Sequence, residues 1–391
     1  MKVTNIISVF ICGIIFIWSG PVYSEDQADQ SSSVPIEFEG YYKSLFTQSR
    51  SLATKENFYA FLQRVRLKAK ADLSEQWQFV VNYDIESILN DFRNTPDFAT
   101  IQNKNQGALA AWDADHVLHD ADNHYMRHSL YRAYINYYSP AFRAVLGKQK
   151  VDWGRTRFWS PLDLFNPVNP LDIEYTERVG VDAVNLEHSF EDFSSLALVY
   201  AAGPNKDLAS IGMKYAKTLG TTDVFAVGGQ FREDEVVGFG FDGQLANAGV
   251  RGEFTYTHPQ NDGDYFRSVL GLEHSFENTL TLLGEYFYNG GADKTAFLQN
   301  LSDFRYTSRV LTRNKHLLGL NADYEWTPLL KMHQMMIYDM EDNSVFFNPQ
   351  FNYNLKANLD IVLGSQFFWG RTGSEFGSYE NVYYIQTQFY F

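Results

Sequence analysis

The residues best suited to act on a small charged molecule stand together in the segment WGRTRFWSPLDLFNPVNP, residues 153–170. Arg155 and Arg157 supply guanidinium groups, which bind anions through several N–H donors, and Asp163 supplies a carboxylate. Three prolines keep the segment out of helix and strand interiors and reduce the entropy lost when it becomes ordered. We therefore predict a stiff loop whose charges face water and whose apolar side chains pack on a wall: Trp153, Phe158, Trp159, Leu162, Leu164 and Phe165.

Metal-ligand chemistry is concentrated in a second segment, WDADHVLHDADNH, residues 112–124. It carries four aspartates and three histidines: Asp113, Asp115, Asp120, Asp122, His116, His119 and His124. Carboxylates at this density could hold Ca²⁺, and the histidines could recruit a transition metal. The segment lacks the glycine and the terminal glutamate of an EF-hand loop, and a solvated acidic surface explains the same residues. We therefore predict neither metal import nor a cofactor.

The elements that must position these residues read as β-strands, because apolar and polar residues alternate with a period of two. Segments 57–73, 75–87 and 357–369 show the pattern clearly. Each predicted strand has about 10–13 residues, which suffices for a tilted strand to cross a bilayer. Because no edge can remain unpaired in lipid, such strands must close into a barrel. The fold class predicted is all-β, a transmembrane antiparallel up-and-down barrel.

Counting along the chain predicts about 18 strands, and a count of 16 follows if the pair at 222–244 is misread. Short turns such as 139–140, 277–278 and 327–328 alternate with long loops such as 88–125 and 154–172, as in outer-membrane barrels. A barrel of this size can hold an aqueous lumen. The strands are predicted near 36–47, 57–73, 75–87, 126–138, 141–153, 173–189, 193–203, 208–218, 222–233, 236–244, 247–258, 264–276, 278–290, 313–326, 329–339, 344–354, 357–369 and 380–391.

The beginning of the chain reads as a secretory signal, with Lys2 before an apolar stretch at 6–18 and a cleavage site at 22–24. An uncleaved membrane anchor is the alternative. The predicted organisation is a signal peptide at 1–24, a short periplasmic segment at 25–35 and the barrel at 36–391. The single cysteine, Cys12, lies in the signal, so the mature chain would contain no disulfide and no haem-attachment motif. With so short a periplasmic segment, no plug domain is expected.

The last residues, YYIQTQFYF, form an alternating aromatic strand that ends at Phe391. This pattern resembles the signal by which the barrel-assembly machinery recognises Gram-negative outer-membrane barrels. Composition agrees with such a barrel, because 25 Tyr and 32 Phe residues suit aromatic girdles at the membrane interfaces. The formal net charge of −15 argues against binding nucleic acid. The predicted surroundings are outer-membrane lipid and lipopolysaccharide.

If the apolar residue of each alternating pair faces lipid, the polar residue faces the lumen. The inward basic residues are then Arg66, Lys68, Lys70, Arg132 and Arg178, with Arg143, Lys148 and Lys150 as further candidates. The inward acidic residues are Asp242, Glu253, Glu273, Glu285, Asp323 and Asp360, with Arg251 and Arg267 as exceptions. Such an arrangement could orient dipolar solutes across the lumen. Alternatively, the charges pair with strand neighbours and keep the lumen wet.

The sequence around the loop resembles a segment of porin-like outer-membrane barrels, G-[RK]-Q-x-x-x-W-G … P-x-D … N-P, a group distantly related to alginate-export and capsule-assembly barrels. The resemblance covers about 25 residues and implies a porin-like barrel. Because the third loop of many porins folds into the barrel, it also implies that 153–170 lies in the lumen. The matching residues are Gly147, Lys148, Gln149, Trp153, Gly154, Pro161, Asp163, Asn166 and Pro167.

These observations predict an outer-membrane channel for passive diffusion of small hydrophilic solutes, anionic or zwitterionic, constricted by the loop at 153–170. A barrel for polysaccharide export or capsule anchoring, or a sheath around a partner protein, is the alternative. An enzyme is not expected, because the adjacent His128 and Ser129 point to opposite faces of a strand. Oligomers are compatible with the sequence, which carries no diagnostic patch for them.

Overall fold

A computed structural model describes residues 35–98, 110–167, 169–174, 178, 180–294 and 312–391. The predicted signal peptide at 1–24, and all but the last residue of the segment at 25–35, lie outside the described residues. Within the described part of the chain, no helix is long and apolar enough to cross a membrane. The unit that begins at Pro35 is built almost entirely from β-strands.

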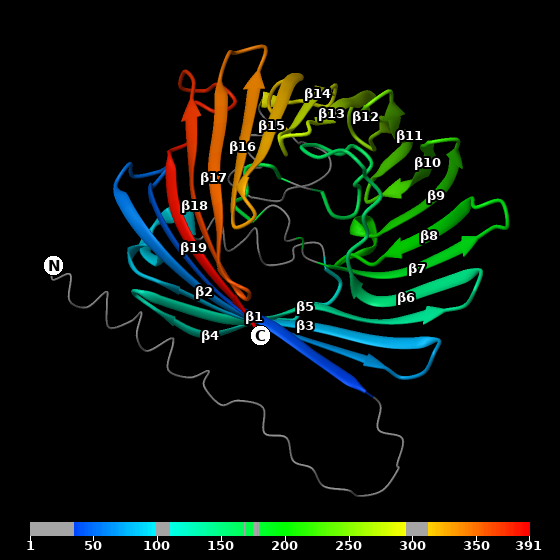
Figure 1. Cartoon of the computed structure of the whole chain (residues 1–391), viewed down its shortest axis with the longest axis horizontal. Coiled ribbons are helices and arrows are strands. Elements are labelled where there is room, and N and C mark those ends of the chain that lie inside the picture. Colours follow the sequence, from blue (N-terminus) through cyan, green and yellow to red (C-terminus); the bar gives the residue numbers. More distant parts are fainter. Residues whose placement is uncertain (1–34, 99–109, 168, 175–177, 179, 295–311) are drawn as a thin grey trace, which may run out of the picture. The chain divides into compact units, whose positions relative to one another are not determined.

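The unit is a closed antiparallel barrel, in which the first strand pairs with the last one (Figure 1). Eighteen strands form its wall in chain order, and a nineteenth, β4, is added beside β5. The strands are β1 (Ile36–Arg50), β2 (Asn57–Asp72), β3 (Trp77–Leu89), β4 (Asp115–Ala121), β5 (His124–Tyr138), β6 (Phe142–Gln149), β7 (Val181–Ser189), β8 (Ser195–Ala201), β9 (Ser210–Leu219), β10 (Thr222–Phe231), β11 (Asp234–Leu245), β12 (Ala248–His258), β13 (Tyr265–Ser275), β14 (Thr281–Asn289), β15 (His316–Thr327), β16 (Leu330–Asp339), β17 (Val345–Lys356), β18 (Leu359–Trp369) and β19 (Val382–Tyr390).

The predicted fold class and the count of 18 wall strands are confirmed, and the alternative of 16 strands is wrong. The doubtful pair at 222–244 forms two strands, β10 and β11, that pair along their whole length. Because strands run alternately up and down, the connections fall on two sides of the barrel. One side, the turn side, has short connections such as 220–221 and 357–358, and the other, the loop side, has long ones such as 150–180.

Outward side chains are mainly apolar, which is what a lipid-facing surface requires. Large exposed apolar residues recur at alternate positions, as in Leu270 and Leu272 of β13. In each strand, the residues between the outward ones point inward. Some of the inward residues are buried and charged, such as Glu253 of β12, which has no exposed surface. The barrel is therefore apolar on the outside, and its inner wall includes buried charged groups, unlike the core of a soluble domain.

Two predicted strands are wrong at their loop-side ends, and the physical reason is that the chain leaves the wall. β6 ends at Gln149 instead of 153, and β7 begins at Val181 instead of 173, because the residues between them enter the lumen. This departure leaves the loop-side half of β5 without a partner on one edge. β4 pairs there with residues 124–129 of β5, whereas β6 pairs with residues 133–138. β4, which lies in a segment predicted to be a loop, thus pairs with the backbone N–H and C=O groups of β5 that β6 does not reach.

Candidate functional site in the barrel lumen

The loop between β6 and β7 runs inside the barrel (Figure 1). Its apolar side chains pack on the inner wall. Its first half covers the inward residues of β8, β10 and β11, where Val199 has no exposed surface. The Trp153 ring meets Phe165 edge to face, with ring centroids 4.9 Å apart. A buried apolar core thus exists inside the barrel only because the loop fills part of it. The members that come from the loop are Val151, Trp153, Leu162, Leu164 and Phe165.

Farther around the wall, Phe158 and Trp159, which lie between Trp153 and Leu162 in the chain, form a second buried cluster on β13 to β17. Trp159 stacks on Phe287 of β14, with centroids 5.2 Å apart and planes inclined by 17°. Phe287 is fully buried under the Trp159 ring, and Phe346, in the same cluster, is fully buried beside Phe368 and Phe376. The loop therefore extends along more than half of the lumen wall, from β7 to β17.

Glycines in the wall make room for these side chains. A Cβ on Gly319 of β15 would lie 2.8 Å from the Phe158 ring, and one on Gly238 of β11 would lie 2.4 Å from a methyl group of Leu162. Real Cβ contacts are not that short, so side chains at these positions would push the loop away from the wall. The glycines in these strands thus mark where another chain segment approaches closely.

A carboxylate of the wall, Glu253 of β12, binds the backbone of the loop. One oxygen accepts the N–H groups of Arg155 and Thr156 at 2.5 and 3.0 Å. The other oxygen accepts the Ser160 hydroxyl at 2.7 Å and the Leu162 N–H at 3.1 Å. Four donors therefore compensate a carboxylate that is completely buried.

A second carboxylate, Glu285 of β14, binds the backbone of the loop between the residues that Glu253 binds. Its two oxygens accept the N–H groups of Arg157 at 2.7 Å and Phe158 at 2.9 Å. Glu253 and Glu285 were predicted to line the lumen, and both do point inward, but the loop covers them. We call them the two anchor carboxylates, because they bind the loop through its backbone and leave its arginine side chains free to project elsewhere.

The far end of the loop crosses to the opposite side of the barrel. The Leu171 carbonyl accepts a hydrogen bond from Gln366 of β18 at 2.8 Å. Glu174 accepts one from Lys43 of β1 at 2.5 Å and one from Arg64 of β2 at 2.9 Å. Burial alone would raise the pKa of Glu174, but the charges of Arg64 and Lys43 lower it, so this carboxylate stays ionised.

Arg178, predicted to be an inward residue of a strand, lies in the loop before β7. Its guanidinium bonds to the carboxylate of Asp163 and lies 3.4 Å from Asp152. The prediction that Asp163 faces water is wrong, because this carboxylate is buried against Arg178. Arg132 of β5 donates to the Arg178 carbonyl at 3.1 Å. These contacts fold the returning end of the loop onto its first half, close to where the chain left the wall.

The basic residues of β2 face carboxylates on β3, which sequence reasoning did not include among the site residues. Arg66 binds Asp84 through two hydrogen bonds of 2.6 Å, and Arg64 binds Glu86 at 2.6 Å. Arg127 of β5 reaches the same Glu86 at 2.5 Å. The alternation in β3 already placed both carboxylates inward, so this signal could have found the pairs.

The remaining basic residues predicted for the lumen have weaker or more exposed partners. Lys148 lies 3.7 Å from Asp182, and Lys150 lies 2.7 Å from Asp152 in the loop. Lys70 is at the turn-side rim, 3.0 Å from Glu37. The Lys68 ammonium lies 5.9 Å from the centre of the Tyr41 ring. Arg143 lies near the turn-side end of β6, with its guanidinium 5.6 Å from the Tyr138 ring.

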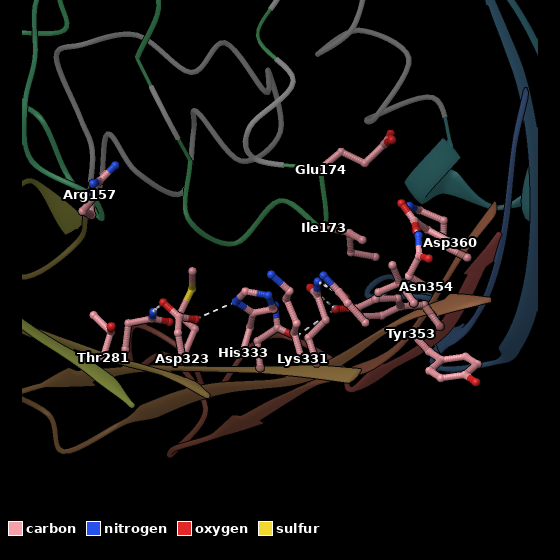
Figure 2. Close-up of a pocket in the computed structure, with 18 of the residues that line it drawn as sticks. Arg157, Ile173, Glu174, Thr281, Asp323, Lys331, His333, Tyr353, Asn354 and Asp360 are labelled. Atoms are coloured by element: carbon pink, nitrogen blue, oxygen red, sulfur yellow. Dashed lines mark hydrogen bonds and ion pairs between the residues drawn. The ribbon is translucent and has the colours of Figure 1, made fainter. Parts of the chain in front are cut away.

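Below the loop, on the turn side, the lumen contains a cavity of about 950 Å³. Arg157, Ile173 and Glu174 approach it from the loop, and strand residues such as Asp323 and His333 line the other side (Figure 2). Within the described part of the chain, the exposed guanidinium groups of Arg155 and Arg157 make no ion pair. Of the predicted acidic residues, Glu273 lines the cavity 3.3 Å from Arg251, and Asp323 lies 2.5 Å from His333.

The aspartate-rich segment lies around β4, on the loop side. Asp115 is 3.6 Å from Arg127 and Asp120 is 2.6 Å from Arg93, so both already have cationic partners. Asp113 accepts the Asp115 N–H, and Asp122 is exposed in the turn after β4. Among the described residues, no group of three or more His, Cys, Asp or Glu side chains is placed to hold a metal ion.

Comparison of the structure with solved proteins identifies barrels of the outer-membrane porin type. OccAB1 of Acinetobacter baumannii is 9% identical over 91% of this chain and 96% of its own, with a TM-score of 0.56. OccAB4 of the same organism is 10% identical over 93% and 100%, also with a TM-score of 0.56. OccD3 (OpdP) of Pseudomonas aeruginosa is 9% identical over 91% of both chains, with a TM-score of 0.55. No protein-family model and no curated protein matches the sequence. At this identity the shared property is the fold, a closed antiparallel barrel of the kind that Gram-negative outer-membrane porins have.

Proposed function

We propose that this chain is an outer-membrane channel through which small hydrophilic solutes diffuse passively. The observation that supports this most directly is a loop fixed inside a closed barrel by two buried carboxylates, beside a polar cavity of about 950 Å³. A lumen filled entirely by packed side chains would stabilise the barrel but would leave no path for a solute. Here the wall provides glycines and anchor carboxylates that hold the loop against it, and the cavity lies beside the loop. In this proposal the barrel at 36–391 enters the membrane after removal of the signal at 1–24.

In the proposed channel, the loop at 153–170 forms the constriction, and Arg155 and Arg157 set its selectivity. Most cations of the wall have a carboxylate partner close by, so their fields are largely cancelled at a distance. The Arg155 and Arg157 side chains carry no such partner in the described part of the chain. Anionic and zwitterionic solutes are therefore favoured over cations. We further propose that the assembly machinery reads β19 up to Phe391. The channel needs no catalytic group.

Single-channel recording in planar bilayers tests the proposal. The folded protein is expected to show stable open steps, and the reversal potential in a salt gradient should indicate a preference for anions. Changing Arg155 and Arg157 together to Ala should weaken that preference, because the two uncompensated charges of the loop are lost. Changing the ion-paired Lys70 to Ala is the matched control and should leave the selectivity nearly as it was. A folded barrel that never conducts would contradict the channel and favour a closed barrel for polysaccharide export or capsule anchoring.

A further inference from the structure

One wall of the cavity differs from the rest of the lumen, because most of its inward residues are amides. Its charged member is Asp360 of β18, which accepts a hydrogen bond from Asn354 at 2.7 Å. Four successive inward positions of β17 are Asn348, Gln350, Asn352 and Asn354, and all four line the cavity. Gln386 lines it from β19. We define these residues, together with Tyr384, as the amide wall. Beyond β1, the next strands of the wall, β2 and β3, carry ion pairs instead.

The strand register arranges the amide wall in rows across β17, β18 and β19. Asn352 pairs with Val362, and Val362 pairs with Gln386, so an apolar residue lies between two amides. In the next row, Gly364 lies between Gln350 and Tyr384. Neighbouring strands are about 4.8 Å apart, so the outer members of one row are separated by roughly 10 Å at the backbone.

Hydrogen bonds between neighbours fix the direction of these amides. The Tyr384 hydroxyl lies 3.0 Å from Asn348 Oδ1 and 3.2 Å from Gln350 Oε1. Gln350 in turn donates to Asn352 at 2.8 Å. Because side chains that are already ordered lose little entropy on binding, such a surface is prepared for a ligand.

We propose that the amide wall is a binding subsite for a neutral polyhydroxylated solute of the size of a mono- or disaccharide. Each amide presents both a donor and an acceptor, and so does each hydroxyl group of a sugar, whereas neither carries a charge. The apolar face of a sugar ring can lie on Val362, which lines the cavity between the two amides. This inference rests on the proposed channel and names a second class of solute for it.

The ring edges would meet Asn352 and Gln386 on either side. The residues of this row, Asn352, Val362 and Gln386, are uncharged. A sugar ring bound across the row would therefore leave the anion preference of the loop arginines unchanged. A charged solute would gain nothing from the amide wall beyond hydrogen bonds. Neutral and anionic solutes thus use different groups of one cavity, the amide wall and Arg157.

Maltose is the probe, used in two independent measurements on the folded full-length barrel. In planar bilayers, maltose should reduce the ion current more than a polyethylene glycol of matched mass, which has few hydroxyl groups. In detergent, saturation-transfer NMR should show magnetisation passing from the protein to the sugar ring. Changing Asn352 and Gln386 together to Leu should weaken maltose binding about tenfold, since two hydrogen bonds of about 0.5–1.5 kcal/mol each are lost. The matched control changes Asn82, an amide of β3 on the ion-paired side, to Leu.

The possible results separate this inference from the proposed channel. A barrel that conducts but does not bind maltose in either measurement overturns the subsite and leaves the channel intact. Equal binding by the wild type and the Asn352→Leu, Gln386→Leu variant also overturns it. A barrel that binds maltose through these residues but never conducts supports the subsite and contradicts the channel. Retention of the anion preference in the variant, with weakened maltose binding, is the expected result.

Discussion

Removing the two anchor carboxylates should release the loop from the wall without unfolding the barrel. In the Glu253→Leu variant, four buried donors lose their acceptor at once. Each unsatisfied donor costs about 1–3 kcal/mol, so the attached loop would be destabilised by roughly 4–8 kcal/mol, allowing for partial relaxation. This is comparable to the whole stability of an ordinary domain, about 5–15 kcal/mol. Adding Glu285→Leu removes the acceptor of two further N–H groups.

The barrel itself keeps its backbone hydrogen bonds, because the loop is not a member of the wall. We therefore expect the double variant to fold, as judged by circular dichroism and heat-modified gel mobility, and to give a larger and noisier single-channel conductance. Glu277→Leu, in an exposed turn on the turn side, is the control and should conduct like the wild type. Glu253→Gln keeps one acceptor oxygen and should fall between the two. Unchanged conductance and noise in a folded double variant would refute the anchoring role.

Two further predictions follow from the packing and from one buried acid. Gly319→Val should displace Phe158, because the Phe158 ring would lie 2.8 Å from the first added carbon. The unfolding free energy measured by chemical denaturation should fall by about 1–3 kcal/mol. Gly263→Ala, in open space, should be neutral, and equal stability of the two variants would contradict the tight fit. Burial and the nearby Asp339 raise the pKa of Glu375, in the loop after β18, from 4.5 to about 8. Between these two pH values the native state binds more protons than the unfolded state, so the free energy of unfolding should fall as the pH rises from 4.5 to about 8. Glu375→Gln should abolish that slope in thermal melts from pH 5 to 9, because the amide oxygen can still accept the N–H groups of Arg313 and Asn314 but cannot ionise; an unaltered slope would assign it to another group.

Much of the candidate site could be predicted because the lumen wall obeys a local rule. Inward positions alternate with lipid-facing ones, so Arg66, Glu253 and Asp323 could be assigned to the lumen without coordinates. The partners of these residues could not be assigned in the same way. Asp84 opposes Arg66 because of strand register, and register depends on how neighbouring strands and turns fit together.

By itself, the sequence determined the closed antiparallel architecture with 16 or 18 wall strands, the apolar exterior and the stiffness of the segment at 153–170. These properties follow from a period of two and from proline, which act over a few residues. Only the tertiary structure decided that β6 stops at Gln149, that β4 takes the vacated edge of β5, and that Glu253 and Glu285 hold the loop. Each of these depends on groups about 90 or more residues apart along the chain, or on the departure of a segment from the wall, and alternation carries no information about such contacts. The physical reason is that a buried carboxylate or an open strand edge must find partners wherever the closed barrel brings them.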